Sequence, residues 1–351
     1  MLVLQPEKTN NLSSVFRTPP PYFLLGINKF IFPLKKPKIL FRGTPDFAVE
    51  SLKALYDADY PIIGVVTMPD KPAGRGQKIR FSPIKEFALA KNLTLFQPEK
   101  LKDPVFIHQL QALDIDLGVV VAFRMLPEVL WNLPKHGTIN LHGSLLPQYR
   151  GAAPINWAII NGEKETGYTI FRLKHEIDTG KLWAQEKMPI HPEDNAGNVH
   201  DKMMVLGAQL LVKTIQRFAN GEIEEQAQTD ELEGRPIQHA PKIFKETCQI
   251  TKQFTAEQAH NRIRGLSPYP GAWTVLMNEK MESLEIKIYS SELLEDEKAE
   301  MGFVSTDNKG FIHINLCGGK VALTEIQAQG KRRMNVREFL AGNKLMGNWK
   351  I

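Results

Sequence analysis

Short apolar runs alternate with helical patterns between residues 38 and 123, and this alternation limits the fold more than any other feature of the sequence. The runs KILF, IIGVVTM and DLGVVVAF, with the shorter TLFQP, resemble strands that are buried on both faces of a sheet. The stretches between them open on Thr-Pro, Ser-Pro and Asp-Pro pairs at residues 44–45, 82–83 and 103–104, as expected for a helix N-cap followed by proline. The sequence therefore predicts an α/β fold with a doubly wound parallel sheet and helices on both faces.

The chain beyond this pattern divides into further parts. One long helix is predicted at residues 195–221, and a polar, turn-rich stretch follows it. The later segments WTVLMN, LEIKIYS, GFVSTD, GFIHINL and KVALTEIQ are predicted to be short strands, and their even spacing indicates a small β-barrel. We expect a flexible N-terminal extension at residues 1–37, an α/β domain at 38–221, a linker at 222–245 and a barrel domain at 246–351.

The net charge of +5 says little about a nucleic-acid partner, because it is concentrated at one end of the chain. Residues 1–40 contain six basic residues and one acidic residue, so the remainder is close to neutral. Binding to RNA must therefore depend on local basic clusters.

No sequence feature predicts export or membrane insertion. The apolar part of the N-terminal arm is interrupted by Asn28 and Lys29, is shorter than the roughly 18 residues of a membrane span, and is followed by no small-residue cleavage site. A mitochondrial presequence is the alternative, which three consecutive prolines and few arginines disfavour. Cys248 and Cys317 form no CxxC pair, so neither a disulfide framework nor a cysteine zinc site is predicted, and we expect a cytoplasmic protein.

Polar residues alternate at the end of one predicted strand, in the segment INLHGSLLP. Asn140, His142 and Ser144 occupy positions two apart, so they share one side of the strand. Asp178, in EIDTG, follows the next predicted strand, and the carboxyl ends of parallel strands meet at one rim. A carboxylate that hydrogen-bonds one imidazole nitrogen makes the other more basic, and a carboxamide can polarise a carbonyl oxygen. The set Asn140, His142 and Asp178 therefore suits transfer of an acyl group to an amine, although a lone histidine is more often structural.

Two other chemistries fit the sequence less well. Ser144 lacks the second glycine of a G-x-S-x-G nucleophile, which favours a turn-forming role for its hydroxyl. No HExxH motif occurs, and an asparagine and a histidine with a distant aspartate make a poor metal site, so no metal is predicted.

Basic residues gather in a glycine-rich loop, PDKPAGRGQKIR, and near two other segments. Such a loop is most often a solvated turn, but cations beside an active-site rim also suit a phosphate-bearing substrate. The candidates are Lys71, Arg75, Lys78, Arg80, Arg150, Lys331 and Arg332.

The segments NLHGSLLPQYRGAAPINWAIINGEKETGYTIF, EIDTG, GTPDFA and PDKPAGRG together resemble those of the methionyl-tRNA formyltransferases, within the wider family of 10-formyltetrahydrofolate-dependent formyltransferases. The resemblance runs from about Lys38 to the C-terminus and is strongest up to residue 220. It implies a Rossmann-like catalytic domain joined to an OB-like β-barrel. It also implies transfer of a formyl group from 10-formyltetrahydrofolate to the α-amine of methionyl initiator tRNA, with Asn140, His142 and Asp178 as the catalytic set. Separately, the near-neutral charge of the catalytic part suggests that the protein contacts RNA as a monomer.

The resemblance also implies where the substrates bind. The loop that holds Arg75 would meet the acceptor end of the tRNA. Where many relatives have a Tyr-Gly pair, this chain has Phe123 and Arg124, which affects the pterin site. The residues expected around the pterin are Phe123, Arg124, Leu126, Pro127, Ser144, Leu145, Leu146, Pro147, Ile177 and Thr179.

Three alternatives remain open from the sequence. A formyltransferase of the same family could act on a nucleotide or sugar-nucleotide amine, although the AGRG loop argues against it. A formyltetrahydrofolate hydrolase would share the three catalytic residues without needing an RNA-contacting barrel. A tRNA-binding module without chemistry would have no reason to keep all three.

Overall fold

The computed structural model describes residues 36–73, 78–229, 231–232, 234–295 and 300–351. The N-terminal extension predicted at residues 1–37 lies almost entirely outside the described residues, and so does Arg75 of the basic loop. None of the helices in the described part of the chain has both the length and the apolar character that a membrane span requires.

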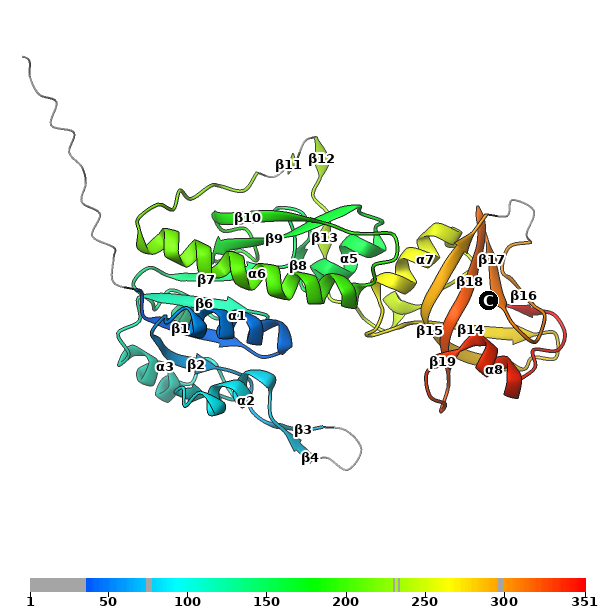
Figure 1. The fold of residues 1–351 in the computed structure, drawn as a ribbon, viewed down its shortest axis with the longest axis horizontal. Coiled ribbons are helices and arrows are strands. Elements are labelled where there is room, and N and C mark those ends of the chain that lie inside the picture. The colour runs from blue at the N-terminus through cyan, green and yellow to red at the C-terminus, as the bar shows by residue number, and fades with distance from the viewer. Residues whose placement is uncertain (1–35, 74–77, 230, 233, 296–299) are drawn as a thin grey trace, which may run out of the picture. The chain divides into compact units, whose positions relative to one another are not determined.

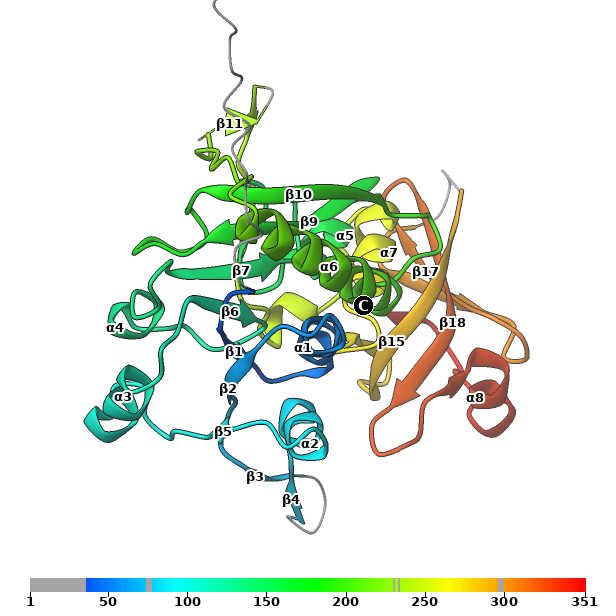
Figure 2. The same ribbon diagram turned by 60° about the vertical axis from the view of Figure 1, so that its left-hand side comes forward.

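A seven-stranded sheet forms the centre of the N-terminal part, in the order β10-β9-β7-β6-β1-β2-β5 (Figures 1 and 2). Strands β7, β6, β1, β2 and β5 are parallel to one another. The strands are β1 (Ile39–Gly43), β2 (Ile62–Val66), β5 (Leu95–Phe96), β6 (Leu117–Val121), β7 (Thr138–His142), β9 (Glu165–Arg172) and β10 (Leu182–Pro189).

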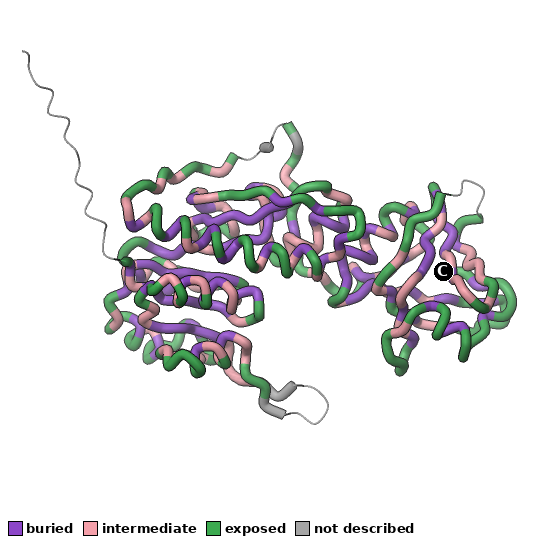
Figure 3. The backbone as a smooth tube through the Cα atoms, viewed as in Figure 1, coloured by how far each residue is buried: buried purple, intermediate pink, exposed green. Residues whose placement is uncertain are grey.

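Helices cover both faces of this sheet, as predicted. Ile39 and Phe41 of β1 pack in one core cluster with α1, α2, α5 and α6, whereas Leu40 packs with α3 and α4 on the other face. Figure 3 shows the strands as largely buried. The helices are α1 (Asp46–Asp57), α2 (Pro83–Ala90), α3 (Pro104–Gln111), α4 (Glu128–Trp131), α5 (Pro154–Ile160) and α6 (Ala196–Ala219).

Two of the three predicted helix caps are confirmed. The Ser82 side chain accepts a hydrogen bond from the Lys85 backbone N–H, and the Asp103 side chain accepts one from Val105. The prediction of Thr44 as N-cap is wrong by one residue, because Pro45 has extended backbone angles and α1 begins only after it. The Thr44 hydroxyl is buried and has no hydrogen-bond partner among the described residues.

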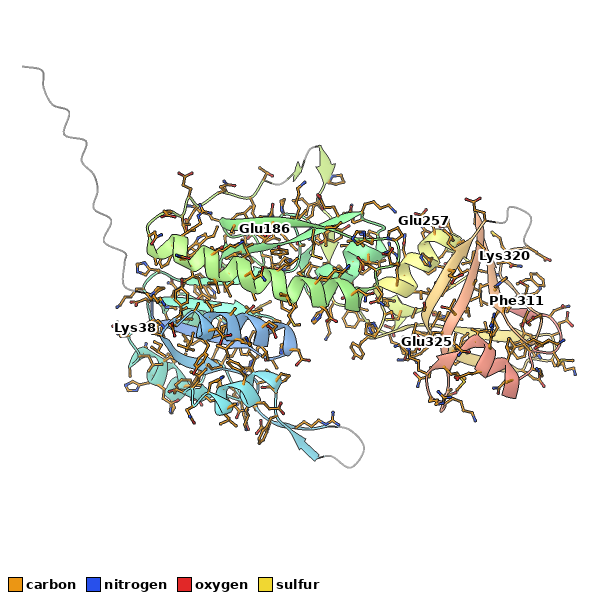
Figure 4. All side chains as sticks on the ribbon, in the orientation of Figure 1. Lys38, Glu186, Glu257, Phe311, Lys320 and Glu325 are labelled. Carbon is orange, nitrogen blue, oxygen red and sulfur yellow. The ribbon has the colours of Figure 1, made fainter. Side chains whose placement is uncertain are left out.

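One strand departs from the predicted parallel arrangement. β9 is antiparallel to β7, and β10, a strand that was not predicted from the sequence, pairs antiparallel with β9 and so runs in the direction of β7. The register places Tyr168 opposite Glu186, whose carboxylate accepts a hydrogen bond of 2.8 Å from the Tyr168 hydroxyl (Glu186 is labelled in Figure 4). A buried strand has the same apolar pattern in either direction, so the sequence did not reveal this reversal.

Arg42 of β1 is fully buried on the face covered by α3 and α4. One of its nitrogens donates a hydrogen bond of 3.0 Å to the Leu130 carbonyl, but Nε and Nη1 have no partner among the described residues. A Cβ at Gly118 would lie 2.9 Å from Arg42 Nη1, so glycine there leaves room for the guanidinium. Burial lowers the pKa of Arg42 from its usual range to about 9.

Short strand pairs lie outside the large sheet. β3 (Lys71–Ala73) pairs with β4 (Lys78–Arg80) in the basic loop, and β11 (Glu231–Leu232) pairs with β12 (Arg235–Pro236). β8 (Arg150–Gly151) pairs in parallel with β13 (His239–Ala240). This last pair joins residues after β7 to the stretch that was predicted as a linker.

The C-terminal part contains a closed antiparallel barrel, as predicted. The strand order β15-β14-β20-β16-β17-β18 closes on itself through the pairing of β15 with β18, and β19 adds to β18. Apolar side chains of the strands and of α7 form the core of this barrel. Its elements are η1 (Glu246–Cys248), α7 (Ala256–Gly265), β14 (Ala272–Asn278), β15 (Ser283–Leu294), β16 (Phe303–Thr306), β17 (Ile312–Leu316), β18 (Gly319–Ala328), β19 (Met334–Asn335), α8 (Val336–Gly342) and β20 (Trp349–Lys350).

Candidate active site

A cavity of about 1570 Å³ lies beyond the carboxyl ends of β1, β6 and β7. Its lining includes Phe47 after β1, residues 122–129 after β6 and residues 140–143 at the end of β7. Residues 151–156 and 173–178 complete much of the remaining wall. Open α/β sheets bind their ligands at these strand ends, so the cavity is the candidate active site.

Asn140 and His142 both line this cavity from β7. The imidazole is 6% exposed, and its Nε2 lies 2.9 Å from the backbone carbonyl oxygen of Tyr149. A carbonyl oxygen can only accept a hydrogen bond, so Nε2 carries a proton. In the neutral ring, Nδ1 is therefore the nitrogen that can accept a proton.

Asp178 also lines the cavity, with its Oδ2 3.9 Å from His142 Nδ1. We expected Asp178 to orient the imidazole by a hydrogen bond, but 3.9 Å is too long for one. The Tyr149 carbonyl orients the ring instead. The carboxylate is close enough to stabilise the ring electrostatically once Nδ1 is protonated.

The chain reaches Asp178 from β9 by a path that differs from the predicted one. Because β9 runs antiparallel, its last residue lies beside the start of β7, where Leu173 N donates to Thr138 O. The loop then turns back to the cavity, and Asp178 takes a left-handed φ of 53°. Its Oδ2 accepts a hydrogen bond of 2.9 Å from the Gly151 N–H.

Tyr149 and Gly151 are functional positions that sequence reasoning missed. Tyr149 acts through its carbonyl oxygen, while its buried hydroxyl donates to Glu163 Oε1 at 2.6 Å. Burial is the main cause that raises the pKa of this hydroxyl. Gly151 has a φ of 127°, and a Cβ there would lie 2.4 Å from the Ala240 carbonyl oxygen. Gly151, the glycine of RGAAP, was the only sequence signal for these two positions. The role of Tyr149 depends on its backbone carbonyl, which every residue type has.

One part of the cavity wall is apolar. Met125 and Ile177 are 73% and 58% exposed, and Phe123, Leu126 and Pro127 line the cavity beside them. Residues 123–127 belong to no helix or strand, so peptide N–H and C=O groups lie next to apolar side chains there. Aromatic and aliphatic walls with a few polar groups are typical of ligand pockets.

Arg124 lines the same wall but has partners of its own. Its guanidinium donates to the carbonyl oxygens of Pro98 and Glu99. Partial burial lowers the pKa of Arg124. The side chain therefore ties the wall to the 98–99 segment.

Five residues predicted to contact the pterin do not line this cavity. The buried Ser144 hydroxyl donates to the Gln148 carbonyl at 2.6 Å, which is the turn-forming role favoured from the sequence. Leu146 is 2% exposed, and its N–H donates to the Thr169 hydroxyl. The Thr179 hydroxyl donates to the Glu176 carbonyl. The five residues are Ser144, Leu145, Leu146, Pro147 and Thr179.

The predicted basic residues fall into different environments. Arg150 donates two hydrogen bonds to the Gln228 side chain, at 3.1 and 2.8 Å, so its guanidinium has an internal partner. Arg80 and Lys331 are exposed, and Arg332 lies 3.3 Å from Glu338 on the surface. Lys71 and Lys78 belong to the β3–β4 hairpin, but their side chains lie outside the description. In the described part of the chain, no group of three or more His, Cys, Asp and Glu residues is placed to hold a metal ion.

Comparison with known proteins identifies the family. Residues 35–215 match the family described as Formyl transferase, and residues 242–344 match Formyl transferase, C-terminal domain. Methionyl-tRNA formyltransferase of Bacteroides thetaiotaomicron is 50% identical over 315 residues, which cover 90% of this chain and 98% of that protein. The protein of the same name from Azobacteroides pseudotrichonymphae is 52% identical over 312 residues, 88% of this chain and 96% of that protein.

A solved structure shows the same fold. The N-formyltransferase of Helicobacter canadensis, in complex with folinic acid and dTDP-3-aminofucose, matches with a TM-score of 0.61 at 21% identity, covering 85% of this chain and 100% of that chain. The sequence matches span both parts of the fold and nearly the full length of the relatives. The chain therefore belongs to the formyl transferase family and, within it, to the methionyl-tRNA formyltransferases.

Proposed function

We propose that the enzyme transfers the formyl group of 10-formyltetrahydrofolate to the α-amino group of methionyl initiator tRNA. The support is the high identity to relatives named methionyl-tRNA formyltransferase. The observation that carries the chemistry is one cavity wall that holds the Asn140 carboxamide and the His142 imidazole, with the Asp178 carboxylate 3.9 Å from Nδ1. When bound, 10-formyltetrahydrofolate supplies a formyl carbonyl attached to nitrogen.

The apolar wall of the cavity suits the pterin ring. Phe123, Leu126 and Ile177 offer apolar contact, and the irregular backbone beside them offers hydrogen-bonding groups to the edge of the ring. We assign these residues and Pro127 to cosubstrate binding. Arg124 is assigned to holding this wall through the carbonyls of Pro98 and Glu99.

The three polar side chains have separate roles in this proposal. The Asn140 carboxamide donates a hydrogen bond to a carbonyl oxygen as that oxygen gains negative charge. His142 Nδ1 accepts the proton that the attacking amine loses and passes it to the departing nitrogen. Asp178 stabilises the protonated ring, and the Tyr149 carbonyl keeps Nε2–H in place throughout.

An acceptor assay tests the proposed function. The enzyme is incubated with 10-formyltetrahydrofolate labelled in the formyl group and, in turn, with charged initiator tRNA, charged elongator tRNA, an amino-sugar nucleotide and no acceptor. We expect the label on the methionine of initiator tRNA. Label released as formate without an acceptor, or found mainly on the sugar nucleotide, would replace the proposal by a hydrolase or a sugar formyltransferase.

We assign contact with the tRNA to the exposed Arg80 and Lys331, and also to Arg332, whose surface ion pair with Glu338 is weak enough to exchange. Lys331→Ala is expected to raise KM for charged tRNA at unchanged kcat. It should also reduce the slope of log KM against log salt by about 0.7–1, the contribution of one phosphate contact. Lys213→Ala, an exposed change on α6, is the control. Equal KM values for Lys331→Ala and wild type would remove this assignment.

We also infer that the enzyme acts as a monomer in the cytoplasm. The support is the two unpaired cysteines, one of them buried, and the near-neutral charge of the chain after residue 40. Light scattering on the purified protein measures its mass directly, and a dimer mass would overturn the first part of this inference. Fractionation of cells expressing the full chain tests the second part.

A further inference from the structure

The stretch between α6 and the barrel contacts the active-site loops at several points. We call residues 226–240 the return segment. At its start, Gln226 and Leu182 exchange two backbone hydrogen bonds, of 2.7 and 3.0 Å. At its end, the Ala240 carbonyl accepts from Ala152 N at 2.7 Å, beside the pairing of β8 with β13. The described residues at the two ends of the return segment thus contact the end of the loop that carries Asp178 and the loop that carries Gly151.

Gln228 lies between these two ends and is bonded on both sides of its carboxamide. Its Nε2 donates to the carbonyl oxygens of Asp178 and Gly180, at 3.0 and 2.8 Å. Its Oε1 accepts from Nε and Nη2 of Arg150, at 3.1 and 2.8 Å. One side chain therefore connects the backbone of Asp178 to the residue immediately before Gly151.

The orientation of this carboxamide is determined by its partners. A guanidinium can only donate hydrogen bonds, and a carbonyl oxygen can only accept them. Turning the amide of Gln228 over would place its NH₂ group against Arg150 and its oxygen against two carbonyl oxygens. All four hydrogen bonds would be lost, so glutamine fits here in one orientation only.

The backbone geometry of Asp178 explains why these hydrogen bonds of Gln228 matter. Asp178 has a left-handed φ of 53°, which is unfavourable for a residue with a side chain and must be held by its surroundings. Its carboxylate contacts Gly151 N–H at 2.9 Å and lies 3.9 Å from His142 Nδ1. The Gln228 amide donates a hydrogen bond to the backbone carbonyl of Asp178. It also accepts hydrogen bonds from Arg150, which belongs to the same short strand as Gly151.

We propose that Gln228 is a positioning residue for the reaction, which sets the place of the Asp178 carboxylate beside His142. This proposal rests on the proposed function for the role of Asp178. Among the described residues, the hydrogen bonds of the Gln228 side chain reach one residue of the cavity wall, Asp178, and none reaches His142. Its effect on the reaction is therefore exerted through Asp178.

Two substitutions distinguish the role of the donor NH₂ group of Gln228 from that of its acceptor oxygen. Gln228→Ala removes both halves. Gln228→Glu keeps an oxygen for Arg150 but loses the donor and turns a carboxylate oxygen toward the carbonyls of Asp178 and Gly180. Both variants are expected to lower kcat about 10- to 100-fold, since a displacement of about 1 Å near reacting groups can cost 100-fold. The KM values for both substrates stay within about twofold, as expected for a loss confined to the chemical step.

Gln226→Glu is the matched control. It adds the same charge two positions away, where the side chain is exposed and the contacts with Leu182 are made by the backbone alone. We expect wild-type kcat for this variant. Thermal unfolding of all variants shows whether any loss of rate comes from loss of folded protein.

A double-mutant cycle with Asp178→Ala tests whether Gln228 acts through Asp178. If it does, adding Gln228→Ala to Asp178→Ala changes kcat by less than about twofold, because the group being positioned is already absent. If the two losses instead multiply, Gln228 acts by another route and the proposal is wrong. A raised KM for tRNA with unchanged kcat in Gln228→Ala would overturn it as well, in favour of a binding role.

Hydrogen exchange gives a readout that does not depend on activity. The Gly151 N–H is protected by the Asp178 carboxylate, so its exchange reports the position of that side chain. Exchange of Gly151 should be faster in Gln228→Ala, approaching the rate in Asp178→Ala, and unchanged in Gln226→Glu. Unchanged protection in Gln228→Ala would show that Asp178 holds its place without Gln228.

These measurements distinguish failure of this proposal from failure of the proposed function. A wild-type enzyme that does not formylate charged initiator tRNA, or an Asp178→Ala enzyme with normal kcat, contradicts the proposed function and the catalytic assignment. An active wild type with an impaired Asp178→Ala variant and an unimpaired Gln228→Ala variant contradicts only the role of Gln228.

Discussion

Replacement of His142 by alanine lowers kcat by about 100- to 10 000-fold, the range usual for loss of a general acid–base group. The imidazole is the group in the proposed catalytic set that accepts the proton of the attacking amine and passes it to the departing nitrogen. Its Nδ1 lies 3.9 Å from Asp178 Oδ2, and its Nε2 is hydrogen-bonded to the Tyr149 carbonyl. Rapid-quench measurement of a single turnover reports this loss separately from product release.

A second substitution keeps the structural part of His142. Because the ring is 6% exposed and packs edge-on to Phe171, alanine also leaves an empty volume and an unpaired Tyr149 carbonyl. His142→Gln places an amide NH₂ where Nε2–H was and retains a donor for Tyr149, but it has no nitrogen that accepts a proton. It should be folded and as slow as the alanine variant, whereas His136→Gln, an exposed change away from the cavity, should be fully active. A His142→Gln enzyme within tenfold of the wild-type kcat would refute proton transfer by His142.

Replacement of Arg42 by methionine raises the free energy of unfolding by about 1–4 kcal/mol, the gain seen when buried charged groups are exchanged for apolar groups of similar size. Arg42 is completely buried and makes one hydrogen bond, to Leu130 O, while Nε and Nη1 lack partners in the described structure. Removing a charge from water without pairing it is costly. Urea unfolding at pH 7 measures the change, and Lys213→Met on the exposed face of α6 controls for added hydrophobicity. A less stable Arg42→Met protein would show that the bond to Leu130 outweighs the cost of burial.

The pH dependence of stability follows from the same residue. Burial lowers the folded-state pKa of Arg42 to about 9, well below its value in the unfolded chain. Below pH 9 both folded and unfolded chains therefore carry the proton, and the full cost of burial is present. As pH rises above about 9, the folded chain loses this proton before the unfolded chain does, and the cost diminishes. The stability advantage of Arg42→Met over wild type should therefore be constant from pH 7 to about 8.5 and shrink at pH 9.5–10.5.

The sequence was informative where the cause of a structure is local. Ser82 and Asp103 cap helices through bonds to residues three and two positions away, and the capping pattern is visible in a few letters. The alternation of Asn140, His142 and Ser144 predicted one shared side of a strand. Asn140 and His142 do line the cavity from β7, but Ser144 lies beyond the end of that strand and does not. The doubly wound sheet and the barrel were also predicted from patterns that span only a few residues.

The features that escaped prediction depend on contacts between distant residues. Gln228 bonds to the backbone of a residue fifty positions earlier, and no local pattern marks a side chain that will meet a backbone carbonyl. Every residue type has a backbone carbonyl, so the sequence does not show that the carbonyl of Tyr149 will bond to His142. Arg150 appeared as a surface cation, yet its guanidinium is bonded to Gln228. The antiparallel direction of β9 belongs to the same class, because both directions bury the same apolar run.

The contacts of residues 226–240 also extend the part of the chain that shapes the active site beyond the long helix α6. The match to the Formyl transferase family ends at residue 215, and α6 ends at Ala219. A truncation there would strip the backbone partners from Leu182, Tyr149 and Ala152. A fragment that ends just beyond Ala240 retains these partners, so the residues that follow α6 help to shape the catalytic pocket.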